Sequence, residues 1–111
     1  MEEIWWFLMD FNKKIMENDN LENYYPGDDS WHRFAMLFAD EWANCLFKDE
    51  LLSALNDNED IAMVIYASVR QNALQWIDES VPALNSITPR ECMKTEDGRK
   101  RLKTMLTRMP R

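Results

Sequence analysis

Glycine and proline are scarce in this sequence, which has two glycines and four prolines among its 111 residues. Chains rich in β-structure place both residues in their many turns, and disordered chains are usually enriched in them. The sequence also shows no sustained alternation of apolar and polar residues, no internal repeat and no low-complexity tract. These absences argue against a β-rich or disordered chain and predict an all-α protein, with helices packed on helices.

Histidine and cysteine are also rare, which limits the metal and catalytic chemistry that can be expected. Cys45 and Cys92 are far apart, and His32 is the single histidine. They form no metal-ligand spacing, so we expect no metal site, and a secretory signal is absent, so we expect reduced thiols in a cytoplasmic protein. No nucleophile with a positioned base can be named. We therefore predict that the chain is not an enzyme and uses no cofactor.

Long apolar runs are missing, and aromatic residues are abundant. The apolar run at 4–9 is only six residues long and follows two glutamates, so it predicts neither a signal peptide nor a membrane span. Five Trp, five Phe, three Tyr and eight Met supply ample core material for one domain. The aromatic excess also makes a homodimer plausible.

The charge is divided unevenly along the chain. Residues 1–60 carry fifteen Asp or Glu against four Lys or Arg, a net charge of −11, whereas residues 61–111 carry five against nine, a net of +4. One interpretation is that a basic helix packs beside an acidic half and both faces are solvated. The other is an acidic surface that repels nucleic acid and a basic end that engages an acidic partner.

Apolar periodicity predicts a single domain over 1–111, built as a compact bundle of about four to five helices. The half at 1–60 is acidic and aromatic-rich. The helices expected before the last third are an amphipathic helix of about four turns over 1–18, a helix that follows a cap at Asp29 or Ser30 and ends at 47, a short helical turn over 48–55, and a helix over 61–77.

The last third of the sequence is dense in helix start and stop signals. Pro82 ends the preceding helix, because proline disfavours helical geometry in the residue before it. Thr88 with Pro89 and Glu91 has the pattern of a capping box with proline at the first helical position, and it predicts a short capped helix. Thr95 can cap again, which predicts a basic amphipathic last helix over 96–109.

This ordered series resembles the toxin-binding domain of the antitoxin Xre/MbcA/ParS family, over residues 69–109. The matching positions are Trp76, Pro82, Ala83, Leu84, Thr88, Pro89, Arg90, Thr95, Gly98, Arg99, Leu102 and Leu106. The resemblance implies an α-helical inhibitor that neutralises a RES-domain toxin, a class that consumes NAD. It also implies that the C-terminal helix and tail lie over the toxin's active-site cleft.

We therefore expect a protein partner bound by the C-terminal third. The expected partner-binding residues are Trp76, Pro82, Leu84, Thr88, Pro89, Arg90, Thr95, Gly98, Arg99, Leu102, Arg108 and Arg111. Family members often carry an N-terminal helix-turn-helix that binds DNA. A DNA-reading helix needs basic residues against phosphate, and the strongly acidic first half offers none. Direct binding to nucleic acid is thus not expected.

Plainer interpretations of the same residues stay open at this stage. Caps and turns alone account for Thr88, Pro89 and Gly98, and a tryptophan such as Trp76 is more often core than contact. The arginines at 90 and 99 have a structural alternative as well, since each can pair with a nearby carboxylate such as Glu91, Asp97 or Asp78.

An alternative function rests on the acidic half. It would be a decoy that mimics nucleic-acid charge and blocks a nucleic-acid-binding protein, as a phage-encoded inhibitor of a defence system would. The carboxylates that would carry it are Asp28, Asp29, Asp40, Glu41, Asp49 and Glu50. A third option is a scaffold module of a larger assembly.

Overall fold

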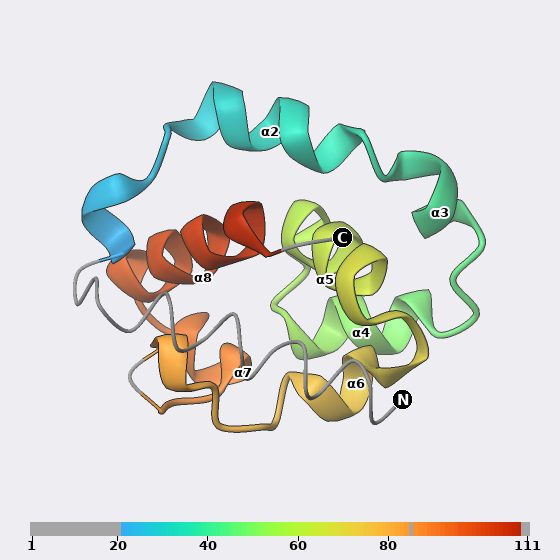
Figure 1. Cartoon of the computed structure of the whole chain (residues 1–111). Helices are drawn as coiled ribbons and strands as arrows, with labels where there is room; N and C mark the ends of the chain where they lie inside the picture. The colour runs from blue at the N-terminus through green and yellow to red at the C-terminus, as the bar shows by residue number, and fades with distance from the viewer. Residues whose placement is uncertain (1–20, 85, 110–111) are drawn as a thin grey trace.

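Helices follow one another along the chain in the computed structural model, which describes residues 21–84 and 86–109 (Figure 1). The elements in order are η1 (Leu21–Tyr24), α2 (Asp28–Met36), α3 (Ala39–Ala43), α4 (Lys48–Ala54), α5 (Glu59–Val69), η2 (Arg70–Asn72), α6 (Ala73–Trp76), η3 (Pro82–Leu84), α7 (Pro89–Cys92) and α8 (Glu96–Arg108). Within these residues, extended pairing is limited to an isolated bridge between Val81 and Ile87. The predicted all-α class is confirmed, while the helix predicted over 1–18 lies outside the described residues.

Helix α5 is the centre of the core. It contacts α2, α3, α4, α6 and α8, and its residues 61–65 are all buried. The largest side chains that are fully buried come from every part of the described chain: Trp31, Leu51, Leu55, Ile61, Ile65, Trp76, Ile77, Leu84, Leu102, Met105 and Leu106. Each buried leucine or isoleucine of this kind contributes about 1.5–3 kcal/mol. The two charge-distinct halves of the sequence therefore share a single hydrophobic core.

The helix predicted to run unbroken to residue 47 is divided, and its predicted cap is wrong. Helix α2 begins after Gly27, whose φ of 102° suits glycine, rather than after Asp29 or Ser30. The chain then turns between α2 and α3. Trp31 and Trp42 would lie about 16 Å apart along one continuous helix. Their indole nitrogens instead donate to adjacent carboxylates at the start of α5, so the chain has to bend between them.

The helix predicted over 61–77 is also divided, at Arg70. This residue has a φ of 55°, an unusual value for a residue other than glycine. Its guanidinium lies 2.7 Å from Glu41 Oε2 of α3, a charge contact that lacks hydrogen-bond alignment. The turn at η2 lets α6 approach the core at a new angle, so that Ala73 and Trp76 are buried. No glycine or proline marks this break, since it arises from packing between distant elements.

Acidic pairs mark the starts of the helices in the first half. The first turns of α2, α3, α4 and α5 contain Asp28–Asp29, Asp40–Glu41, Asp49–Glu50 and Glu59–Asp60 respectively, and the four residues at the N-cap make no side-chain capping bond. Negative charge at a helix N-terminus is stabilising because it faces the positive end of the macrodipole. Much of the acidity of the first half thus has a local structural cause.

The pair at the start of α5 has a second role. Trp31 Nε1 donates to Asp60 Oδ2 at 2.7 Å, and Trp42 Nε1 donates to Glu59 Oε2 at 3.0 Å. Both indole rings are buried, so their N–H groups need partners inside the fold. These two hydrogen bonds join α2 and α3 to the N-terminus of α5. We call this pair of contacts the tryptophan clamp.

Candidate protein-binding surface

The segment 88–99, here called the α7–α8 elbow, is built largely as the sequence predicts. Thr88 Oγ1 accepts from the backbone N–H of Glu91 at 3.1 Å, with Pro89 in the first turn of α7. Thr95 Oγ1 accepts from the N–H of Gly98 at 2.9 Å. The Glu91 carboxylate pairs with Lys94 at 3.1 Å. The short capped helix before the last helix is therefore present, and both threonines act as N-caps.

Gly98 lets the two helices of the elbow meet closely. A Cβ at this position would lie 2.4 Å from the carbonyl oxygen of Cys92 and 2.8 Å from Thr95 Oγ1. Arg99 adds a further link, because its Nη1 donates to the carbonyl of Met93 at 2.9 Å. The T-x-x-GR pattern therefore holds α8 rigidly against α7.

The expected partner-binding residues divide between core and surface. Those buried inside this chain are Trp76, Leu84, Pro89, Gly98 and Leu102. Those exposed are Pro82, Arg90, Thr95 and Arg108, while Thr88 and Arg99 are half-buried. Arg111 lies outside the described residues. The buried group can support a partner surface only from beneath, so direct contact falls to the exposed group.

Arg90 is one of two exposed cations of the elbow, the other being Lys94. Its Nε and Nη2 donate to the two carboxylate oxygens of Asp78 at 2.7 and 3.2 Å, and this hydrogen bonding lowers the pKa of Asp78 below its usual value. The side chains of Arg90 and Asp78 are 45% and 57% exposed, and ion pairs so exposed contribute little stability. An acidic group on a partner could therefore replace Asp78 at small cost.

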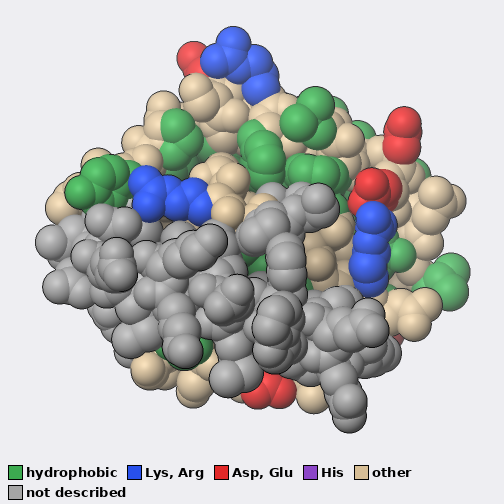
Figure 2. Space-filling view, in the orientation of Figure 1, with side chains coloured by type: hydrophobic (Ala, Val, Ile, Leu, Met, Phe, Trp, Pro, Cys, Tyr) green, Lys and Arg blue, Asp and Glu red, His purple; other side chains and the backbone are tan. Residues whose placement is uncertain are grey.

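Two cations of α8, Lys103 and Arg108, stack on aromatic rings of the first half. Lys103 Nζ lies 5.4 Å from the ring centre of Tyr25 and 5.7 Å from that of Trp31, and the Arg108 guanidinium lies 5.1 Å from the ring centre of Tyr24. On the face shown in Figure 2, the visible Lys and Arg side chains lie in separate places with hydrophobic side chains between them. The basic helix thus packs beside the acidic half, as the plainer interpretation of the charge pattern expected.

Tyr25 shows how closely the two halves are joined. Its hydroxyl donates to Asp28 Oδ1 at 2.7 Å. Burial and this hydrogen bond raise the pKa of Tyr25 well above its usual value. Tyr25 therefore holds the start of α2 while its ring receives Lys103 from α8.

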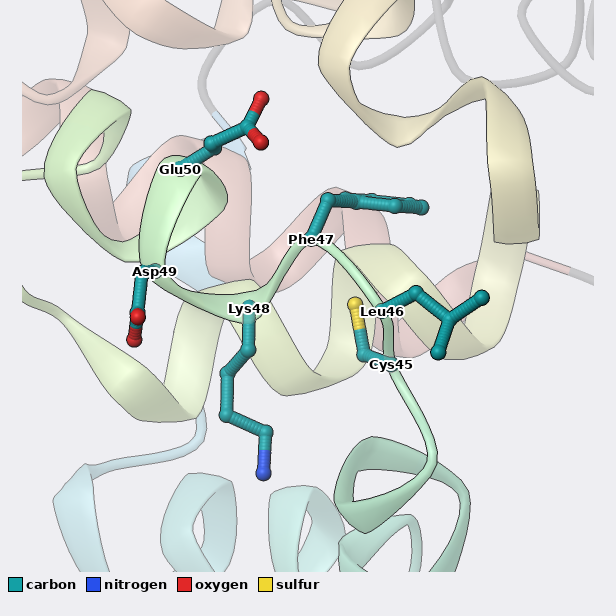
Figure 3. Close-up of a pocket in the computed structure, with 6 residues that line it drawn as sticks. All are labelled: Cys45, Leu46, Phe47, Lys48, Asp49 and Glu50. Atoms are coloured by element: carbon teal, nitrogen blue, oxygen red, sulfur yellow. The ribbon is translucent and has the colours of Figure 1, made fainter.

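The nucleophilic and metal-binding side chains lie apart from one another. Cys45 and Cys92 are both free and buried, and burial raises the pKa of Cys92 to about 11, whereas His32 is exposed on α2. Residues 21–84 and 86–109 contain no group of three or more His, Cys, Asp or Glu side chains arranged to hold a metal ion. A pocket of about 310 Å³ lies at residues 45–50, where α3 leads into α4 (Figure 3).

No helix in the described part of the chain combines the length and the apolar character needed to cross a membrane.

No protein-family model, curated protein or solved structure matches this sequence.

Proposed function

We propose that this chain is a protein-binding inhibitor whose partner surface is the exposed side of the α7–α8 elbow together with the C-terminal end of α8. The observation that carries the proposal is the elbow itself. Two threonine caps and a close glycine contact hold the short helix α7 against the start of α8, and the exposed Arg90 of α7 has only a weak intramolecular partner. A rigid surface loses little entropy on binding, which favours recognition.

The resemblance of residues 69–109 to the toxin-binding domain of Xre/MbcA/ParS antitoxins supplies the class of partner, a RES-type toxin that consumes NAD. Arg90 and Arg108 are both exposed and can pair with carboxylates on such a partner. Complex formation would take place in the cytoplasm, where the two buried thiols stay reduced.

The test is co-purification of the chain with the product of the neighbouring gene, followed by an assay of NAD consumption by that product. We expect a stable complex. We also expect NAD consumption to fall as the chain is added and to be lost when the chain and the toxin are equimolar. The double variant Arg90→Glu and Arg108→Glu should lose both effects, because each change places a negative charge against an acidic partner. Arg33→Glu is the matched control, since Arg33 is an exposed arginine on α2.

Two results would contradict the proposal. One is the absence of any complex with wild-type chain. The other is a complex that the double variant forms as well as the wild type does, with circular dichroism showing that both are folded. Removing α8 is a poorer test, because Leu102, Met105 and Leu106 belong to the core and their loss would unfold the chain.

A second candidate function is the acidic decoy, and one observation favours it. The carboxylate residues Asp28, Asp29, Asp40, Asp49 and Glu50 are all exposed. They could repel nucleic acid and attract a protein that binds it. Charge reversal of these residues should abolish inhibition of such a protein, and inhibition that persists would exclude the decoy.

A further inference from the structure

Two leucines at the ends of α3 are unusually exposed. Leu46, which follows α3, is 98% exposed, and Leu37, which precedes it, is 74% exposed. Helix α3 has five residues, so the two leucines flank an element only about 7.5 Å long. Single exposed leucines are common on protein surfaces, but these two are only nine positions apart along the chain.

A pocket lies next to Leu46. It is lined by residues 45–50 and has a volume of about 310 Å³. Figure 3 shows the side chains of Leu46 and Phe47 extending to the right, with Glu50 on the first turn of α4 to the left of Phe47. An apolar side chain from another molecule could enter here and contact both.

The rim of this site is acidic. Residues 39–50 contain four Asp or Glu and one Lys, a net charge of −3. Asp40, Asp49 and Glu50 are exposed, whereas Lys48 directs its Nζ to 5.3 Å from the ring centre of Trp42. Exposed apolar side chains bordered by carboxylates are complementary to a helix that is apolar on one face and basic on the other.

We propose that this α3–α4 edge, formed by Leu37, Leu46, Phe47 and the carboxylates of Asp40, Asp49 and Glu50, binds a basic amphipathic helix of a partner protein. Figure 1 shows the chain between α3 and α4 at the opposite edge of the view from α7 and α8, so this surface is separate from the elbow. The proposal does not depend on the inhibitor function proposed above.

A second copy of this chain is a poorer match for the site. Among the described residues its basic helix is α8, whose apolar side chains Leu102, Met105 and Leu106 are buried in its own core. Presenting that apolar face to another copy would require α8 to leave the core. The complementary charge therefore has to come from a different protein.

The experiment titrates the full chain with a synthetic helical peptide that has leucine on one face and lysine on the other. Calorimetry measures the affinity, and backbone NMR locates the binding site. We expect binding that weakens with salt and chemical-shift changes centred on 37–50. Leu37→Ser and Leu46→Ser should each weaken binding by about tenfold or more, the factor that 1.4 kcal/mol represents. Since both leucines are exposed, these variants should fold normally. Ile87→Ser is the control, as Ile87 is an exposed apolar residue next to α7 and should leave binding unchanged.

Several outcomes would overturn the proposal. Equal binding of a peptide with glutamate in place of lysine would remove the charge argument. Wild-type affinity in both leucine variants, with loss only when the carboxylates are neutralised, would indicate a charge decoy instead. Sedimentation that shows a wild-type dimer and a monomeric Leu46→Ser variant would assign the site to a second copy of the chain.

Discussion

The helices of the first half and those of the last third differ in how their N-terminal turns are stabilised. The first N–H groups of any helix lack partners within it. In α2, α3, α4 and α5 an acidic pair occupies the first turn, and the residue at the N-cap makes no side-chain bond. In α7 and α8 a threonine hydroxyl accepts directly from the backbone. The helices of the first half therefore rely on charge without a side-chain cap, whereas α7 and α8 add a directed hydrogen bond to the acidic residues of their own first turns, Glu91 in α7 and Glu96 with Asp97 in α8.

This difference bears on how each half is interpreted. Charge at a helix start acts without a fixed geometry, so it stabilises the helix without fixing the angle at which the chain enters it. A threonine cap fixes the entry of the chain, which suits an elbow that must hold Arg90 in place. Acidity in the first half is thus partly structural, whereas the threonine caps fix the geometry of the elbow on which the proposed binding surface depends.

The tryptophan clamp gives the acidic half two directed contacts with buried side chains, and breaking it should have the largest effect. Asp60→Ala leaves the buried N–H of Trp31 without its partner at 2.7 Å. A hydrogen bond to a charged group contributes about 1.5–3 kcal/mol, so we expect a loss of this size in the free energy of unfolding in urea. Asp60→Asn keeps an acceptor and should lose less. If both variants match the wild type, the clamp does not stabilise the fold.

The buried thiol of Cys92 in the last third should make stability depend on alkaline pH. Burial raises the pKa of Cys92 from 9.0 to about 11, so its stabilising contribution is complete below pH 9 and is lost as the pH rises through 11. The loss should be roughly 2 kcal/mol at pH 11. Urea unfolding from pH 8 to 11 should show a shallower decline in Cys92→Ala than in the wild type. An unchanged slope in Cys92→Ala would contradict the assignment.

The elbow depends on Gly98, and its replacement should have the next largest effect. In Gly98→Ala the new methyl group meets the carbonyl of Cys92, which is backbone and cannot turn aside. Overpacking costs about 1–3 kcal/mol, and better helix propensity returns up to about 1 kcal/mol. We expect a net loss of about 1–2 kcal/mol in thermal or urea unfolding. Asp97→Ala, at the exposed neighbouring position, should cost less, and equal stability of Gly98→Ala and wild type would show that the contact can relax.

The features that the sequence predicts correctly are local. Thr88 and Thr95 can be identified as caps because a cap depends on the few residues that follow it. The exposed ion pair of Arg90 with Asp78 was also among the alternatives.

The features that the sequence does not predict depend on contacts between distant residues. The turn after α2 brings Trp31 and Trp42 to one end of α5, and nothing in residues 36–39 marks it as a break. Arg70 adopts a left-handed φ beside Glu41, which is 29 positions earlier. The motif residues Trp76 and Leu102 lie in the core, because apolar periodicity alone does not distinguish burial within the chain from contact with a partner.

The smallest predicted effect is the most direct test of the contrast between charge and cap. Asp49→Asn with Glu50→Gln removes the acidic pair of α4, and each charge should contribute about 0.3–1 kcal/mol at low salt. Thr95→Ala removes the cap of α8 and should cost about 1 kcal/mol. Salt screens charges but does not screen a directed bond between a hydroxyl and an N–H group. Unfolding in 0.05 and in 1 M NaCl, roughly a fivefold change in screening length, should therefore abolish most of the first loss and preserve the second. If both losses shrink equally with salt, the two halves do not differ in how their helices are stabilised. The acidic pairs would then need a different explanation, and partner binding would be the first to test.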